Sequence, residues 1–171
     1  MTKNQTLQAQ AERMQQLTKE LLRRYQLRDR NEITCCGISV SQCYALDTLG
    51  EHGEMTMIQL AGKLYLDKST ATRAINPLVE RGLVQRRFSA ADRREILVSL
   101  TPAGKKFYRE IMANLEASQR QILERIPPQK REHILAALEI LSAAMQDWLA
   151  TCCMPRKVQL QTITKKGVLH E

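Results

Sequence analysis

The chain has 171 residues, of which 43% are hydrophobic, and 26 Lys and Arg against 18 Asp and Glu give a formal net charge of +8. A chain of this length and apolar content can bury a sizeable core, which favours one compact domain with or without a helical extension over two small independent domains. The positive charge suits a polyanionic partner, but charge alone does not distinguish a nucleic-acid-binding protein from a merely basic one.

The N-terminal segment argues against export or membrane insertion. The first 30 residues are rich in Gln, Arg and Lys and contain no apolar core of the signal-peptide kind. The longest mostly apolar stretch, Ile134 to Met145, is interrupted by Glu139 and is shorter than a bilayer requires. We therefore expect a cytoplasmic protein without membrane contact, whose five cysteines are thiols rather than a disulfide framework.

The first half of the chain reads as helices. Apolar residues spaced by three and four from Leu7 to Leu27 predict an amphipathic helix, and the pattern ends in the segment 31–37. The pair Ser39 and Gln42 forms a capping box that predicts a second helix over 40–51.

Two shorter helices follow. Thr56 and Gln59 form another capping box before a helix that ends at Leu64, and Asp67 caps a fourth helix that ends near Arg81, with Gly82 after it. We expect the apolar faces of these two helices to pack together. The residues concerned are Ile58, Leu60, Ala61 and Leu64 in the third helix and Ala71, Ile75, Leu78 and Val79 in the fourth.

The next segment predicts a β-hairpin and a return to helix. The runs 83–88 and 96–100 suit strands, and the polar segment 89–95 between them predicts a hairpin with a charged tip. Thr101 and Pro102 suit the start of a long helix that ends at the pair Pro127-Pro128. The last helix carries apolar residues at alternating spacings of four and three through Trp148, a pattern typical of helix-on-helix packing.

The outer face of the fourth helix and the hairpin tip together favour DNA binding. Short hydroxyl side chains let a helix approach phosphates, and Arg and Asn can bind guanine and adenine edges through two hydrogen bonds; the alternative is a solvated helix face. Arginines on the tip suit an adjacent minor groove, and we interpret Asp92 as a partner that orients a neighbouring Arg. The candidate DNA-binding residues are Ser69, Thr70, Thr72, Arg73, Asn76, Arg93 and Arg94.

The run from Met57 to Gly104 resembles the MarR family of transcriptional regulators. The resemblance rests on Leu60-Ala61, Lys68-Ser-Thr-Ala-Thr-Arg73, Glu80-Arg-Gly-Leu-Val84, Asp92-x-Arg94 and Leu100-Thr-Pro-Ala-Gly104. It implies a homodimer whose first, fifth and sixth helices interlock, recognition helices on a palindromic operator, and wings in the flanking minor grooves. Pro77 departs from an uninterrupted recognition helix, because it removes one helix hydrogen bond.

The predicted fold is mainly α with a small β-hairpin wing (α+β), a winged helix-turn-helix with N- and C-terminal dimerisation helices. We divide the chain into an N-terminal dimerisation helix and loop (1–38), a DNA-binding region (39–101), C-terminal dimerisation helices (102–153) and a flexible basic tail (154–171). The apolar stripes of the terminal helices indicate a twofold interface independently of the resemblance. The predicted function is a ligand-responsive regulator, a repressor released from its operator by an effector.

Enzyme motifs are absent from the sequence. His52, His133 and His170 lie far apart without metal-ligand spacing, and no glycine-rich phosphate loop or catalytic triad pattern stands out. We expect no enzymatic activity and no required cofactor.

The five cysteines allow more than one interpretation of the effector. Thiols near a helix N-terminus have lowered pKa values, and two doublets plus a fifth thiol can bind a soft metal, a metalloid or an Fe–S cluster, or react with an oxidant. They can also simply pack as small hydrophobes, and the family resemblance implies an aromatic or phenolic ligand in a crevice between the dimerisation and DNA-binding regions. The other class of function is a thiol-based redox or metal-handling protein without specific DNA binding. The candidate sensor residues are Cys35, Cys36, Cys43, Cys152 and Cys153.

Overall fold

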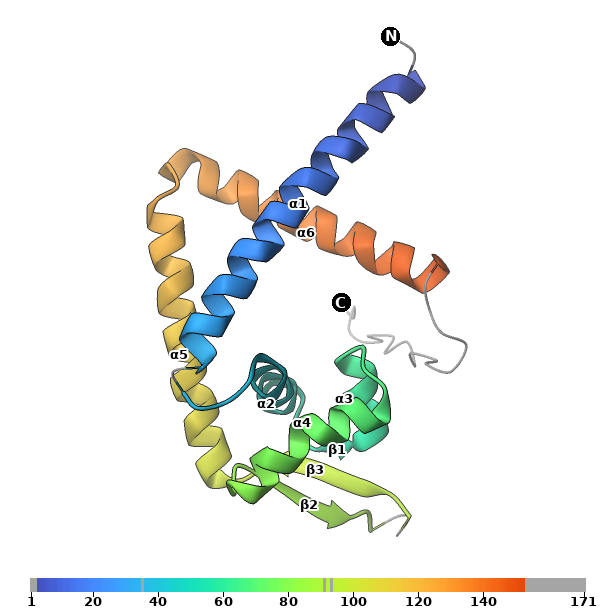
Figure 1. The fold of residues 1–171 in the computed structure, drawn as a ribbon, viewed down its shortest axis with the longest axis vertical. Helices are drawn as coiled ribbons and strands as arrows, with labels where there is room; N and C mark the ends of the chain where they lie inside the picture. The colour runs from blue at the N-terminus through green and yellow to red at the C-terminus, as the bar shows by residue number, and fades with distance from the viewer. Residues whose placement is uncertain (1–2, 35, 91, 93, 153–171) are drawn as a thin grey trace, which may run out of the picture. The chain divides into compact units, whose positions relative to one another are not determined.

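The computed structural model describes residues 3–34, 36–90, 92 and 94–152, and the order of its elements matches the predicted one except for an additional two-residue strand (Figure 1). The fold is mainly helical with a small antiparallel sheet, as predicted for a winged helix. The helices are α1 (Lys3–Thr34), α2 (Val40–His52), α3 (Met57–Lys63), α4 (Lys68–Glu80), α5 (Pro102–Glu124) and α6 (Pro128–Cys152). The strands are β1 (Met55–Thr56), β2 (Val84–Phe88) and β3 (Ile96–Leu100).

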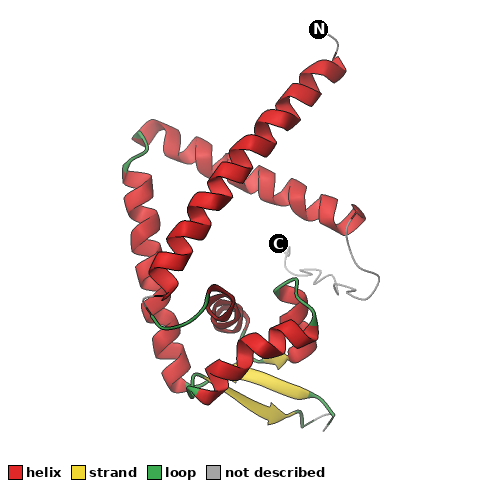
Figure 2. Cartoon of the chain, viewed as in Figure 1, coloured by secondary structure: helices red, strands yellow, loops and turns green. Residues whose placement is uncertain are grey.

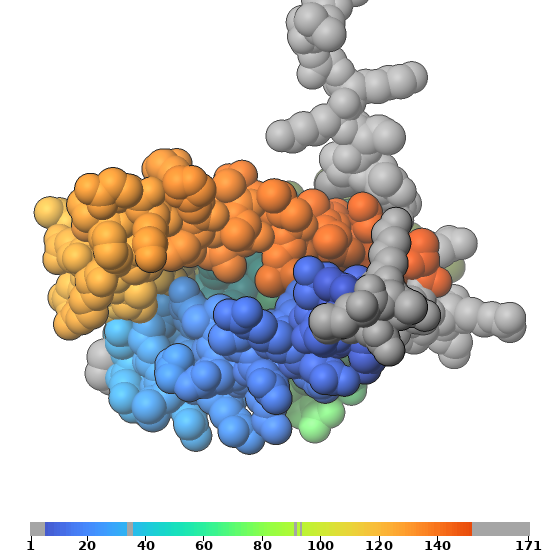
Figure 3. All heavy atoms as spheres, turned by 90° about the horizontal axis from the view of Figure 1, so that it is seen from above, coloured from blue at the N-terminus to red at the C-terminus, as the bar shows by residue number. Residues whose placement is uncertain are grey.

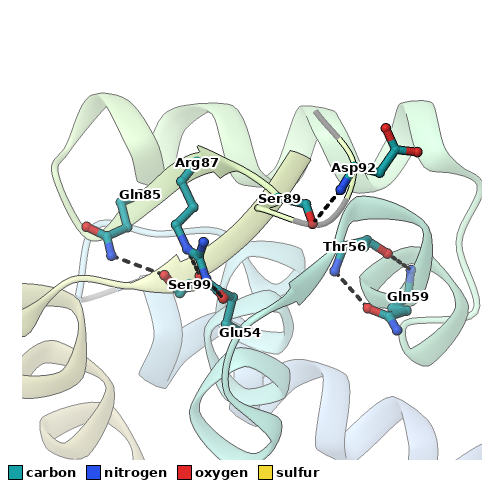
Figure 4. A network of polar contacts seen from close by, with 8 residues as sticks. All are labelled: Glu54, Thr56, Gln59, Gln85, Arg87, Ser89, Asp92 and Ser99. Carbon is teal, nitrogen blue, oxygen red and sulfur yellow. Dashed lines mark hydrogen bonds and ion pairs between the residues drawn. The ribbon is translucent and has the colours of Figure 1, made fainter. Parts of the chain in front are cut away.

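The helix starts follow the local signals in the sequence. Ser39 Oγ accepts from the Gln42 N–H at 3.3 Å while the Gln42 side chain accepts from the Ser39 N–H at 2.8 Å, so the capping box before α2 is complete. Thr56 and Gln59 repeat this arrangement before α3 (Figure 4). Gly82 has a φ of +69° directly after α4, the left-handed conformation expected of a residue that ends a helix.

Helix α1 is longer than predicted at both ends. The apolar stripe indicated a helix over residues 7–27, whereas α1 runs from Lys3 to Thr34. The last two turns contain polar residues but bury Asp29 and Ile33. Tertiary packing therefore extends the helix beyond its periodic stripe.

The sheet has the strand order β1-β3-β2, and both pairs are antiparallel (Figure 2). Strand β1 was not predicted, because two residues are too few for a sequence signal; Met55 lies opposite Val98 of β3. Val84, Val98 and Leu100 are buried, while the far end of the hairpin extends away from the helices. The sheet thus anchors the wing at its base.

The core lies among α2, α3, α4, the sheet and the first turns of α5. Leu46, Leu60, Ile75 and Leu78 are fully buried at its centre. The prediction for Ile58 was wrong, since its side chain is 68% exposed. Because α3 begins at Met57, the inward positions are Met57, then Leu60 and Ala61 three and four residues later, and Ile58 falls on the outer face.

The chain divides into two compact units, 1–117 and 118–171, with the boundary inside α5. In the second unit the chain turns between α5 and α6, where Arg131 Nε donates to the carbonyl oxygens of Leu123 (3.0 Å) and Ile126 (3.1 Å). The apolar side chains of α6 stay largely uncovered, including Ile140, which is 72% exposed. Figure 3 shows side chains of α1, in blue, and of α6, in orange, at the surface.

Helix α6 also corrects an expectation about length. Among the described residues, Pro128–Thr151 is one helix that is long and apolar enough, by length and composition, to cross a membrane, with a mean hydropathy of 1.2 over an 18-residue window. The sequence-based expectation considered only the stretch from Ile134 to Met145, and the helix continues past both ends of it. Length and composition alone therefore do not distinguish a membrane helix from an association helix here.

Candidate nucleic-acid interface

The N-terminus of α4 is fixed by Asp67. Its carboxylate accepts from the Thr70 N–H at 2.9 Å, from Thr70 Oγ1 at 2.7 Å and from Ser69 Oγ. These hydrogen bonds, led by that of Ser69, lower the pKa of Asp67, so the side chain is ionised at neutral pH. Both hydroxyl protons are donated within the cap, and Ser69 and Thr70 therefore present lone pairs, rather than O–H donors, to a ligand.

The predicted recognition residues lie on the outer side of α4. Ser69, Arg73 and Asn76 are exposed, while Thr70 and Thr72 are half-buried, and Thr72 Oγ1 donates to the Lys68 carbonyl at 2.7 Å. The inner side buries Ala71, Ala74, Ile75 and Leu78. Helix α4 continues through Pro77 to Glu80, so the residues beyond Asn76 remain helical.

Arg73 lies beside a shallow hollow of about 250 Å³ between the start of α2 and α4. Its Nη2 atom is 3.5 Å from Thr70 Oγ1. The hollow is lined by Ser39, Ser41, Gln42, Thr70, Arg73 and Ala74. Hydroxyl, amide and guanidinium groups make this surface polar, which suits a phosphate or a base edge better than an apolar ligand.

The wing tip is closed by hydrogen bonds from main-chain N–H groups to side-chain oxygens. Asp92 Oδ1 accepts from the backbone N–H of Arg94 at 2.8 Å, and the Asp92 N–H lies 3.4 Å from Ser89 Oγ (Figure 4). Asp92 thus orders the main chain at Arg94, and its expected effect on an arginine side chain stays a prediction. The Arg94 side chain is exposed, and Arg93 lies outside the described residues.

Two arginines of β2 were missed by the sequence reading. Arg87 forms an ion pair with Glu54, through Nε to Oε2 at 2.5 Å and through Nη2 to Oε1, and this contact raises the pKa of Arg87 (Figure 4). On the other face of the strand, Arg86 Nη2 donates to Asn76 Oδ1 at 2.6 Å. Adjacent side chains in a strand point to opposite faces, and this alternation is the sequence signal that could have indicated different partners for the two arginines. One arginine ties the wing to the segment before β1, and the other ties it to α4.

The cysteines do not form a reactive cluster among the residues the structure describes. Cys43 is 1% exposed, and burial, followed by the nearby charges of Asp47 and Asp29, raises its pKa to about 11. The lowered pKa expected near a helix start is therefore wrong for this thiol, because desolvation dominates. Cys36 is half-buried, with Sγ 3.7 Å from the Glu32 carbonyl oxygen.

The rest of the proposed sensor set is not described. Cys35, Cys153 and the side chain of Cys152 lie outside the described residues. Within those residues no group of three or more His, Cys, Asp and Glu side chains is arranged to hold a metal ion.

A polar cluster joins α1 to α2, and no local pattern in the sequence indicates it. Arg28 donates through Nε (3.0 Å) and Nη2 (2.6 Å) to Asp29 Oδ1, and the Tyr44 hydroxyl donates to Asp29 Oδ2 at 3.1 Å. The Arg28 guanidinium also lies 4.6 Å from the centre of the Tyr25 ring. Arg28 Nη1 is buried without a hydrogen-bond partner among the described residues.

The recognition helix, its preceding helix and the anchored wing define the class of protein: a winged helix-turn-helix DNA-binding transcriptional regulator. Comparison with known proteins narrows the class. A model of the MarR family matches residues 38–96. The transcriptional regulator YdgJ of Bacillus subtilis is 30% identical over 64% of this chain and 77% of its own length.

Solved structures agree with this match. A MarR transcriptional regulator from Methanosarcina mazei superposes with a TM-score of 0.70 at 27% identity, over 80% of this chain and 98% of the other. Bordetella bronchiseptica BpsR, described as regulated in its DNA binding by 6-hydroxynicotinic acid, superposes with a TM-score of 0.60 at 25% identity, over 74% of this chain and 98% of the other. The chain belongs to the MarR family.

Proposed function

We propose that this protein represses transcription as a homodimer that binds a palindromic operator and is released by a small effector. The observation that carries the proposal is the exposed polar face of α4, with Arg73 and Asn76, next to a wing that ion pairs and hydrogen bonds fix to the same body. Such a helix fits a major groove while the wing reaches the flanking backbone. The net charge of +8 adds attraction to phosphates.

The uncovered apolar faces of α1 and α6 support the dimer. Leu17 and Leu22 of α1 and Ile140 and Trp148 of α6 are each more than half exposed. Side chains of this size left in water destabilise a monomer, and a second copy of the chain would cover them. Burial of α6 in a dimer interface would also account for its hydropathy, since an obligate dimer interface is as apolar as a protein core. No membrane is needed to explain it.

We propose that the effector is a small aromatic acid bound near Arg28. Arg28 Nη1 is buried and has no hydrogen-bond partner within the described part of the chain, which costs free energy. A carboxylate would satisfy it while the rings of Tyr25 and Tyr44 contact an aromatic body. The regulation of BpsR by 6-hydroxynicotinic acid supports this class of effector. Sensing by Cys35, Cys36 and Cys43 is the alternative, and the raised pKa of Cys43 counts against a thiolate mechanism.

Operator binding tests the core of the proposal. A randomised duplex library selected with the purified protein is expected to yield a palindrome, and fluorescence anisotropy should show affinity falling by orders of magnitude from dilute buffer to a few tenths molar salt. Sedimentation of the complex should give two chains per duplex. A flat salt response, or the absence of any selected sequence, contradicts DNA-binding repression.

Effector titrations of the bound complex separate the two sensor mechanisms. We expect 6-hydroxynicotinic acid or salicylate to release the wild type but not Arg28→Met, while Arg30→Met, an exposed arginine on the same helix, responds as the wild type does. Replacement of Cys35, Cys36 and Cys43 by Ser should leave this release intact. Release by thiophilic metals or peroxides that the triple Ser variant loses would assign sensing to the cysteines instead.

A further inference from the structure

Strand β2 presents its arginines to two different partners. Side chains alternate along a strand, so Val84 and Arg86 share one face while Gln85 and Arg87 share the other. Val84 is buried, which places the first face toward the core and α4. On the second face, Gln85 Nε2 donates to Ser99 Oγ at 3.2 Å and Arg87 pairs with Glu54 (Figure 4). Arg86 is therefore the β2 arginine directed to the recognition helix.

The contact of Arg86 with Asn76 changes what Asn76 can offer to a base. Arg86 Nη2 lies 2.6 Å from Asn76 Oδ1, and a hydrogen bond of this length from a cation is strong. It occupies a lone pair of the only acceptor atom in the Asn76 side chain and holds a positive charge beside it. The Nδ2 group remains as a hydrogen-bond donor.

Adenine recognition by asparagine needs the atom that Arg86 engages. In that pairing Oδ1 accepts from the adenine N6 amino group and Nδ2 donates to N7. The amino group would have to approach Oδ1 next to the Arg86 guanidinium, which is itself a donor. Guanine presents two acceptors, N7 and O6, to which Asn76 Nδ2 and the guanidinium can both donate.

We propose that Arg86 is a specificity-determining residue, which converts Asn76 from an adenine reader into part of a donor pair that selects guanine. The inference rests on the proposed placement of α4 in the major groove. It also revises the role expected for Asn76 from its residue type alone. The wing strand acts here through the recognition helix, in addition to the minor groove.

The test compares base preferences from a randomised duplex library for four proteins. Asn76→Ala first identifies the operator position that Asn76 reads, as the position whose preference weakens most. At that position the wild type is expected to prefer guanine, and Arg86→Ala should shift the ratio of guanine to adenine by about fivefold to a hundredfold toward adenine. Arg87→Ala removes the same charge from the same strand and should leave the preference there unchanged.

The double variant Arg86→Ala with Asn76→Ala supplies the second readout. In the Asn76→Ala background, removal of Arg86 should weaken any remaining guanine preference without a gain for adenine, because the side chain that would read adenine is absent. The inference is overturned if wild type and Arg86→Ala select the same base, if the wild type prefers adenine there, or if Asn76→Ala alters no position. If the wild type selects no sequence at all, the proposed function fails rather than this inference.

Discussion

Gly104 offers a sharp test of how the wing is joined to α5. A Cβ added at this position would lie 1.9 Å from the Leu83 carbonyl oxygen and 2.9 Å from the Leu83 carbonyl carbon. Real Cβ contacts essentially never fall below 3.0 Å, so the oxygen would have to move by more than 1 Å. Both partners are main chain, and no side-chain rotation relieves the overlap.

The displaced carbonyl belongs to a small hydrogen-bond cluster. Leu83 O accepts from the Thr101 N–H at 3.0 Å, Thr101 Oγ1 donates to the Gly82 carbonyl at 2.6 Å, and the Gly104 N–H donates to Thr101 Oγ1 at 3.0 Å. Overpacking costs about 1 to 3 kcal/mol, and each hydrogen bond lost adds about 1 kcal/mol. The greater helix propensity of Ala returns at most about 1 kcal/mol. We therefore expect Gly104→Ala to lower the free energy of unfolding by about 2 to 3 kcal/mol.

Urea denaturation at one fixed protein concentration measures this change, because the stability of a dimer depends on concentration. Ala103→Gly is the matched control: it alters the neighbouring exposed position of the same helical turn and should cost no more than about 1 kcal/mol. The sign of the change in the free energy of unfolding caused by Gly104→Ala distinguishes the two expectations. A neutral or stabilising effect, as helix propensity alone predicts, would refute the close approach of α5 to Leu83.

Two further predictions concern Cys43 and the arginines proposed to contact DNA. The pKa of the Cys43 thiol is 9.0 in the unfolded chain and about 11 in the folded protein. Its contribution to the free energy of unfolding is therefore complete below pH 9 and is lost as the pH rises toward 11. The loss amounts to about 2 to 3 kcal/mol. Unfolding free energies of wild type and Cys43→Ala measured across this range should therefore converge or cross as pH rises, and parallel profiles would contradict the raised pKa. Arg73→Ala should weaken operator binding by about 1 to 3 kcal/mol and relax base preference, whereas Arg94→Ala should weaken binding with less change in preference. Fluorescence anisotropy measures the operator affinity of both variants. If both affinities are unchanged, the recognition surface lies elsewhere.

Local signals in the sequence were sufficient to predict several elements of the fold. The capping boxes at Ser39 and Thr56, the cap at Asp67 and the left-handed Gly82 each involve residues within a few positions of one another, and all are present in the structure. Apolar periodicity likewise placed α2 to α6 and the hairpin within a few residues of their bounds. The order of these elements was enough to indicate a winged helix and the outer face of α4, because hydrophobic spacing fixes which side of a helix is buried.

Contacts between residues distant in the sequence followed from tertiary packing and could not be predicted from local patterns. Arg86 meets Asn76 across 10 positions and Arg87 meets Glu54 across 33, and no local pattern of charge distinguishes these pairs from others. The raised pKa of Cys43 likewise overrides the expected effect of a helix start, because it depends on how completely the surrounding core excludes water. Hydrogen-bond partners and desolvation are set by which surfaces pack together, and that packing exists only once the whole chain has folded.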